Sequence, residues 1–186
     1  MAKITDDVLY GRAALKLGEP WITPGSLEHL KSIVQPGWKV FEWGSGGSTA
    51  FWARHCAFVV SIEHNLEWVQ RTFELLKRLD VPRHKAQLQW WPGKDDKFKS
   101  YATAIQPYRN LDLVFVDGEA SSRGHCLNYA LSHVKPGGYL LLDNSNWLKR
   151  DLGEQWERTD YVEKDLKWIG QSGTFDWWTS ILRKRE

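Results

Sequence analysis

Cysteine is scarce in this sequence: the 186 residues include two, Cys56 and Cys126, and a single methionine. Both cysteines fall in segments that are predicted to be helical, so no disulfide framework is indicated, and a reduced, cytoplasmic setting is expected. The sequence also lacks an apolar run near the roughly 18 residues that a membrane helix needs, and the N-terminus lacks the charged-then-apolar pattern of a signal peptide. We therefore expect no association with membranes.

A dominant charge is missing as well. Lys and Arg number 25, Asp and Glu number 23, and the net charge is +2. This near balance disfavours a nucleic-acid-binding protein and an acidic disordered chain. The length suffices for one well-buried domain and not for two. We predict a single domain over 1–186, with a helical N-terminal segment (1–37), a core (38–143) and a C-terminal strand pair (144–186); the sequence says nothing about the oligomeric state.

Tryptophan, by contrast, is abundant, with twelve residues in the chain. Most of them are expected to fill the core of a small domain. Trp21, Trp52 and Trp147 could instead stack on a substrate, although packing in the core or at the rim of a site is the favoured interpretation. Trp177 and Trp178 are neighbours on a predicted strand, so they point to opposite faces and at least one of them should be buried.

Short apolar strands alternate with helices along the chain. The predicted strands are 38–43, 58–63, 86–91, 111–116 and 139–142; the predicted helices include 26–34, 48–57, one capped by Asn65, and 123–134. Because these strands are apolar on both faces, they predict a parallel sheet that helices cover on both sides. The segments 161–169 and 174–183 then predict a terminal hairpin, which makes the last strand antiparallel.

A glycine-rich loop, Glu42 to Ser48, joins the first of these strands to a helix. Glycines let the backbone approach a ligand closely, and the N–H groups of the helix face that ligand. A dinucleotide-binding loop would have a third glycine where Thr49 stands. Glu42 would repel a pyrophosphate and suits a positively charged ligand, and Glu63 ends the next strand, where a carboxylate can accept both hydroxyls of a ribose. A positive ligand with a ribose indicates S-adenosylmethionine.

From about Thr23 to its C-terminus the chain resembles the class I S-adenosylmethionine-dependent methyltransferases. The resemblance rests on four motifs taken together: E-W-G-S-G-G-S-T, S-I-E-H, V-F-V-D-G and F-D-W-W-T-S-I-L. It implies an α/β fold with a Rossmann-like, seven-stranded, mostly parallel sheet, an antiparallel last strand, helices on both faces, and a cofactor-binding core over 38–143.

The resemblance also implies a set of cofactor-binding residues. Gly44, Ser45, Gly46 and Ser48 would line the methionine part, Glu63 would hold the ribose, and His64 with the Gly93-Lys94 turn would flank the adenine. The remaining residues expected in the cofactor site are Glu42, Thr49, Asp117 and Gly118.

Oxygen-bearing side chains also follow two neighbouring strands. Asp117 closes the strand 111–116, and Asp143 with Asn144 closes the strand 139–142. Three such donors could bind Mg²⁺, which would lower the pKa of an acceptor hydroxyl, in an arrangement similar to that of the metal-dependent catechol and caffeoyl-coenzyme A O-methyltransferases. Ala120, however, stands where the catechol enzymes have a lysine base. In the alternative interpretation, Asp117 contacts the cofactor while Asp143 and Asn144 cap a loop.

We predict O-methylation of a small molecule or glycan. The residues after strand 111–116 do not form the Asn-Pro-Pro-Tyr-like motif of many enzymes that methylate amino groups, and this, with the near-neutral charge, disfavours nucleic acid as the substrate. Asp117, Asp143 and His125 are the candidate catalytic residues, and Glu119 is a further candidate base. Two alternatives stay open: a nicotinamide-dependent oxidoreductase and a non-catalytic cofactor-binding module of the same fold.

Overall fold

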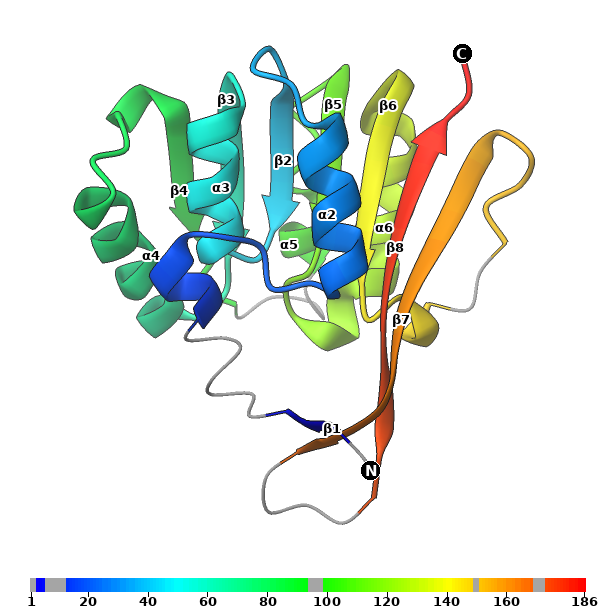
Figure 1. The fold of residues 1–186 in the computed structure, drawn as a ribbon. Coiled ribbons are helices and arrows are strands. Elements are labelled where there is room, and N and C mark those ends of the chain that lie inside the picture. The colour runs from blue at the N-terminus through cyan, green and yellow to red at the C-terminus, as the bar shows by residue number, and fades with distance from the viewer. Residues whose placement is uncertain (1–2, 6–12, 94–98, 149–150, 169–172) are drawn as a thin grey trace.

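The computed structural model describes residues 3–5, 13–93, 99–148, 151–168 and 173–186. Within these ranges an eight-stranded sheet has the order β1-β7-β8-β6-β5-β2-β3-β4 (Figure 1). All neighbouring strands pair in parallel except β8, which is antiparallel to both β6 and β7. The prediction of a mostly parallel sheet with an antiparallel last strand is confirmed, and the short edge strand β1 is added to the seven strands that were expected.

The strands are β1 (Lys3–Thr5), β2 (Lys39–Trp43), β3 (Phe58–Glu63), β4 (Ala86–Trp90), β5 (Leu111–Val116), β6 (Val134–Asp143), β7 (Trp156–Trp168) and β8 (Phe175–Lys184). The helices are α2 (Pro24–Ile33), α3 (Gly47–His55), α4 (Leu66–Arg78), α5 (Lys99–Thr103) and α6 (Arg123–His133). Residues 13–17 are also helical. Short 3₁₀ turns are η1 (Arg83–Lys85), η3 (Ala120–Ser122) and η4 (Ser145–Trp147).

Two hydrophobic clusters cover the two faces of the sheet. Because successive strand residues point to opposite faces, Phe41 belongs to one cluster and Val40 to the other. Helices α5 and α6 contribute to the first cluster, and α2 and α3 to the second, as their placement on either side of the sheet in Figure 1 shows. On β8, Trp177 is buried and Trp178 half-buried, which confirms that at least one of the pair is buried.

Strand β6 is longer than its predicted range because it begins before a proline-glycine-glycine turn. Val134 pairs with Leu111 of β5, and the register shifts before Leu113 pairs with Tyr139. The extra residues 136–138 are accommodated at this irregularity of the pairing. The sequence pattern predicted that they end the preceding helix. Strands β7 and β8 likewise continue beyond the rest of the sheet as a long hairpin, against which β1 pairs (Figure 1).

The carboxyl ends of β2, β3, β5 and β6 lie at one edge of the sheet (Figure 1). This edge therefore brings together the glycine loop, Glu63, Asp117 and Asp143. It is also the edge at which open α/β sheets bind their ligands. In the described part of the chain, no helix combines the length and the apolar character that crossing a membrane would take.

Candidate functional site

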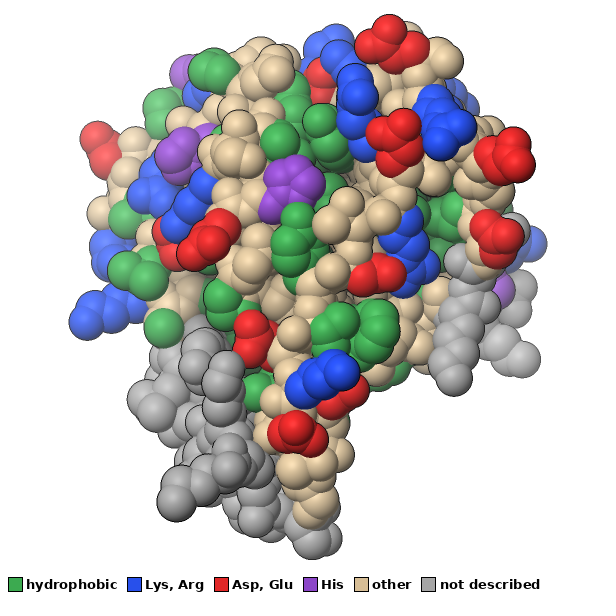
Figure 2. All heavy atoms as spheres, turned by 45° about the vertical axis from the view of Figure 1, so that its right-hand side comes forward, with side chains coloured by type: hydrophobic (Ala, Val, Ile, Leu, Met, Phe, Trp, Pro, Cys, Tyr) green, Lys and Arg blue, Asp and Glu red, His purple; other side chains and the backbone are tan. Residues whose placement is uncertain are grey.

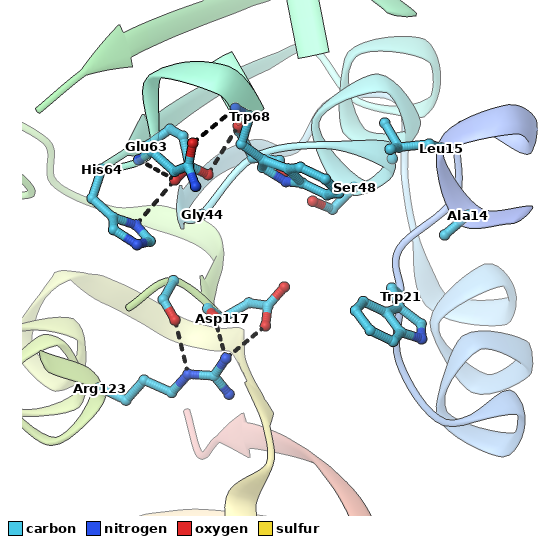
Figure 3. Close-up of a pocket in the computed structure, with 14 residues that line it drawn as sticks. Ala14, Leu15, Trp21, Gly44, Ser48, Glu63, His64, Trp68, Asp117 and Arg123 are labelled. Carbon is cyan, nitrogen blue, oxygen red and sulfur yellow. Dashed lines mark hydrogen bonds and ion pairs between the residues drawn. The ribbon is translucent and has the colours of Figure 1, made fainter. Parts of the chain in front are cut away.

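A cavity of about 290 Å³ opens at these strand ends, between the glycine loop and the segment after β5 (Figure 3). Its lining comes from the N-terminal segment, the loop, β3, α4 and the start of α6. The lining residues are Ala14, Leu15, Trp21, Gly44, Ser45, Gly47, Ser48, Glu63, His64, Asn65, Trp68, Asp117, Gly118 and Arg123. Among the residues predicted to bind the cofactor, Gly44, Ser45, Ser48, Glu63, His64, Asp117 and Gly118 lie here.

The glycine loop adopts backbone conformations that disfavour other residues. Gly44 has φ 102° and Gly46 has φ 143°. A Cβ atom on Gly44 would lie 3.2 Å from the backbone nitrogen of Gly118, so the two backbones approach each other across the end of the sheet. Gly46 is absent from the cavity lining because the indole of Trp68 covers it, with Nε1 3.2 Å from the position of a Cβ atom.

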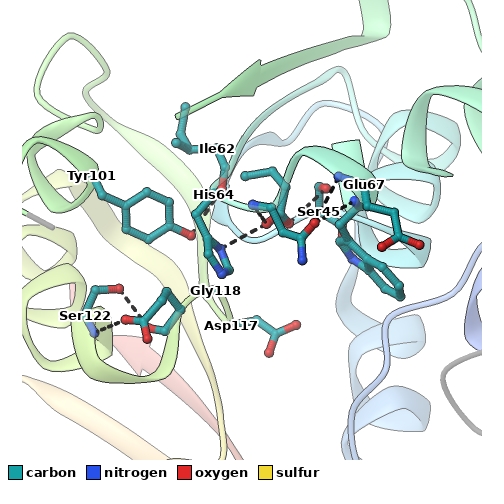
Figure 4. Close-up of polar contacts among 12 residues, drawn as sticks. Ser45, Ile62, His64, Glu67, Tyr101, Asp117, Gly118 and Ser122 are labelled. Atoms are coloured by element: carbon teal, nitrogen blue, oxygen red, sulfur yellow. Dashed lines mark hydrogen bonds and ion pairs between the residues drawn. The ribbon is translucent and has the colours of Figure 1, made fainter. Parts of the chain in front are cut away.

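Glu63 presents a buried carboxylate to the cavity. Its side chain is 3% exposed and accepts hydrogen bonds from Ser45 Oγ at 3.1 Å and from the backbone N–H of Asn65 at 2.8 Å. His64 Nδ1 lies 3.0 Å from Glu63 Oε1, and the hydrogen bond to this carboxylate raises the pKa of His64 (Figure 4). The carboxylate is thus held in one orientation at the end of β3.

Glu42 does not line the cavity, contrary to the prediction that it contacts the cofactor. It is fully buried behind the loop, where Oε1 accepts from Thr49 Oγ1 and Ser61 Oγ at 2.5 Å each, and Oε2 accepts from Trp52 Nε1 at 3.0 Å. Burial raises the pKa of Glu42 to about 7, although the donated hydrogen bonds oppose that rise. Thr49 also accepts a bond from Gly46 N–H at 3.1 Å, so Glu42 and Thr49 brace the loop from behind.

The N-terminal segment forms one wall of the cavity, of which the sequence indicated Trp21 alone. Ala14 and Leu15 line it, and Trp21 lies opposite the loop (Figure 3). Two arginines, one on α3 and one on α4, hold the segment, since Arg54 Nη2 donates to Gly18 O at 2.7 Å and Arg78 Nη2 to Leu15 O at 3.1 Å. The acceptors of these bonds are backbone carbonyls, so no side-chain motif in the segment predicts them.

Some other predicted residues lie away from the cavity. His125 is exposed on α6 and absent from the lining, because the helix turns it toward solvent, so the geometry gives no support to its assignment as a catalytic base. Gly93 also lies outside the lining, with Trp91 beside it, and Lys94 falls outside the described residues. Trp52 is a core residue.

The predicted Mg²⁺ ligands surround the side chain of Arg123. Its Nη2 lies 3.0 Å from Asp117 Oδ1, and its Nη1 lies 2.7 Å from Asn144 Oδ1 and 3.9 Å from Asp143 Oδ2. These residues do not fit a metal ion, because the guanidinium already stands among the three proposed ligands. We correct the metal assignment on this geometry.

The side chains of Asp117 and Asp143 differ in how far they are exposed to the cavity and to solvent. The side chain of Asp117 is 32% exposed and reaches the cavity, whereas that of Asp143 is 7% exposed and accepts bonds from Trp177 Nε1 at 2.9 Å and Thr179 Oγ1 at 3.0 Å. Burial raises the pKa of Asp143 to about 7, the charge of Asp117 adds to the rise, and Arg123 opposes it. Burial also raises the pKa of Asp117, again against Arg123. The geometry thus makes Asp117 the group that a ligand can reach.

Comparison with solved structures identifies the fold. An O-methyltransferase of Klebsiella pneumoniae, so described provisionally, superposes with a TM-score of 0.67 at 17% identity over 98% of this chain and 91% of that one. An rRNA methylase of Streptococcus thermophilus gives 0.64 at 14% identity over 87% and 95%. The O-methyltransferase of Bacillus cereus, in complex with S-adenosylhomocysteine (SAH), gives 0.63 at 16% identity over 95% and 87%.

No protein-family model and no curated protein sequence matches the chain. The solved structures show that the chain has the fold of the class I S-adenosylmethionine-dependent methyltransferases, as the resemblance implied. At 14–17% sequence identity they establish the fold alone.

Proposed function

We propose that this protein is an S-adenosylmethionine-dependent methyltransferase that acts on an oxygen atom of a small molecule or glycan. The observation that carries the proposal is the placement of the Glu63 carboxylate beside the Gly44 backbone in one cavity at the strand ends. A buried carboxylate there suits two ribose hydroxyls. With Asp117 it places two carboxylates against the one guanidinium of Arg123 in the lining, and this excess of negative charge suits a cationic cofactor.

The lining residues divide between the parts of this cofactor. The loop from Gly44 to Ser48 leads into the N-terminus of α3, whose N–H groups suit the carboxylate of the methionine part. Glu63 would accept bonds from the ribose hydroxyls, and His64 would lie at the adenine side. Gly118 leaves room for the cofactor on the β5 side, where a Cβ atom would also collide with Tyr101 Oη at 1.9 Å.

Asp117 would serve as the base. When bound, S-adenosylmethionine supplies a methyl group whose carbon–sulfur bond breaks as the acceptor oxygen forms the new bond, while sulfur keeps the electron pair. The acceptor hydroxyl must lose a proton in this step, and Asp117 can take it. Arg123 holds Oδ1, and among the described residues no hydrogen-bond donor occupies Oδ2, so this oxygen remains for a substrate (Figure 3).

The structure gives less support to the alternative functions. For a nicotinamide cofactor, the position of the third glycine carries Thr49, whose hydroxyl is bonded to Glu42 behind the loop. For a nucleic-acid substrate, the net charge is +2, and on the face in Figure 2 acidic and basic side chains intermingle. A non-catalytic module of the same fold would bind the cofactor and show no turnover.

The proposal is tested by incubating the purified protein with S-adenosylmethionine and a panel of acceptors, and measuring SAH by mass spectrometry. The panel contains phenols, catechols, hydroxylated oligosaccharides and structured RNA. We expect SAH formation with hydroxylated small molecules or glycans. Formation with RNA alone would contradict the proposed acceptor class, and cofactor binding without turnover on any acceptor would favour the non-catalytic module.

A further inference from the structure

Arg123, at the first position of α6, has every N–H group of its guanidinium directed at an oxygen. Nε donates to Gly118 O at 3.1 Å, Nη1 to Asp143 O at 2.8 Å and to Asn144 Oδ1 at 2.7 Å. Nη2 donates to Asp117 Oδ1 at 3.0 Å and to the backbone oxygen of Asp117. Because a guanidinium has five N–H donors, these five bonds use its whole capacity.

The flat face of the same guanidinium is covered as well. The ring of Trp147 lies over it, with 5.4 Å from the ring centroid to Arg123 Cζ, and the side chain of Arg123 is only 9% exposed. A cation–π contact strengthens when water is excluded from the cation. Arg123 is therefore unavailable to a carboxylate or phosphate of a ligand, since binding one would break bonds that it already makes.

The bonds of Arg123 join the ends of two strands. Asp117 and Gly118 follow β5, while Asp143 ends β6 and Asn144 follows it. One cation thus meets two carboxylates and an amide oxygen, the donor set that a divalent metal ion prefers in proteins. Without a positive charge among them, the two carboxylates would repel each other.

We infer that Arg123 is the resident cation of this site, standing in the place of a divalent metal ion among Asp117, Asp143 and Asn144. It is a positioning residue: it fixes Oδ1 of Asp117 so that Oδ2 faces the cavity. The part of the inference that concerns Asp117 as a base rests on the proposed function, whereas the occupation of the cation site does not.

One consequence concerns the acceptor. A metal ion held by these three side chains would keep coordination positions open for substrate oxygens, whereas a saturated guanidinium offers none. An acceptor with a single hydroxyl therefore needs no neighbouring hydroxyl to be recognised here, and phenols should serve as well as catechols.

The inference is tested by titrating Mn²⁺ into the full-length protein and following the free ion by electron paramagnetic resonance. The variants are Arg123→Ala, Asp143→Asn and the double variant Arg123→Ala/Asp143→Asn. The control is Arg185→Ala, which removes an exposed arginine 3.4 Å from Glu157. We expect the wild type and Arg185→Ala to leave Mn²⁺ free at about 1 mM. Arg123→Ala should gain a Mn²⁺ site whose Kd lies at least about tenfold below that concentration, and the double variant should lose this site.

Two results would overturn the inference. The first is Mn²⁺ binding by the wild type that Asp143→Asn removes; the second is a folded Arg123→Ala variant that gains no Mn²⁺ site. If Arg123→Ala does not fold, the wild-type titration against Asp143→Asn decides by itself. SAH binding is measured in the same samples: a wild type that fails to bind SAH contradicts the proposed function, and the Mn²⁺ results still judge the occupation of the cation site.

Discussion

A Cβ atom on Gly47 would lie 2.1 Å from the backbone oxygen of Glu19. The same atom would lie 2.7 Å from the backbone oxygen of Ala14, whose carbonyl also accepts a bond from Glu19 N–H at 3.0 Å. Gly47 is the first residue of α3, so the N-terminal segment rests directly on the start of the helix that we assign to cofactor binding. The wall of the cavity therefore depends on the absence of one side chain.

We predict that Gly47→Ala displaces this wall. Both contacts are to backbone, which cannot rotate away, so the free energy of unfolding should fall by about 1–3 kcal/mol and SAH binding should weaken. The matched control is Gly37→Ala, because nothing lies within 4 Å of a Cβ atom at Gly37. Urea unfolding and calorimetry measure the two effects; unchanged SAH affinity in a Gly47→Ala variant would show that the segment is not part of the site.

Glu42 should make the protein less stable as the pH rises toward neutrality. Its pKa is about 7 in the folded chain and about 4.3 in an unfolded one, so the folded state binds the proton more tightly. The contribution to stability is complete below the unfolded pKa and is lost as the pH rises through the folded pKa. The loss amounts to about 3 kcal/mol between pH 4 and pH 8.

Urea unfolding at pH 5 and pH 7.5 tests this prediction. Glu42→Gln removes the titrating group, so the difference in stability between the two pH values should shrink; Asp143, whose pKa is also raised, keeps part of it. Glu157→Gln is the control, since Glu157 is exposed and pairs only with Arg185 among the ion pairs of the described residues. A pH dependence as steep in Glu42→Gln as in the wild type would contradict the assignment.

Asp117→Asn should abolish most of the turnover and largely spare the binding of SAH, which lacks the positive sulfonium charge of S-adenosylmethionine. The amide keeps an oxygen for Arg123 and loses the ability to accept a proton, so we expect kcat to fall by about 10²–10⁴-fold. The SAH dissociation constant should change by less than about threefold. His125→Ala is the control, because His125 is exposed and away from the cavity. The reverse pattern, with a large loss in His125→Ala alone, would remove Asp117 from the mechanism.

Parts of the fold that depend on local pattern could be predicted from the sequence. The strands Phe58–Glu63 and Leu111–Val116 have the predicted bounds, because each is a mostly apolar run, interrupted once by Ser61 or by Asp112, that a polar or turn residue ends. Asn65 caps α4 as expected, accepting from the N–H groups of Glu67 and Trp68. The start of β6 and the pairing of β1 depend on partners distant in sequence, and no local pattern indicates them.

In the candidate site, too, features that depend on local pattern were predictable and those that depend on distant contacts were not. Gly44, Glu63 and Asp117 end strands, and the parallel topology alone brings strand ends together. The wall around Ala14 depends on bonds to backbone carbonyls, which any sequence can supply. The metal prediction failed because ligand spacing is the same whether the gap holds an ion or a guanidinium; only the contacts of Arg123 distinguish them.

Calorimetric titration of SAH into the wild type and the Glu63→Ala variant tests the central claim most directly. We predict one site in the wild type and a loss of about 1.5–3 kcal/mol in Glu63→Ala, or about 10- to 150-fold in Kd, because hydrogen bonds to a charged group are removed. Glu67→Ala, which removes a 68% exposed carboxylate on α4, should bind like the wild type. A wild type that binds neither SAH nor S-adenosylmethionine, or a Glu63→Ala variant with wild-type affinity, would contradict the assignment of this cavity.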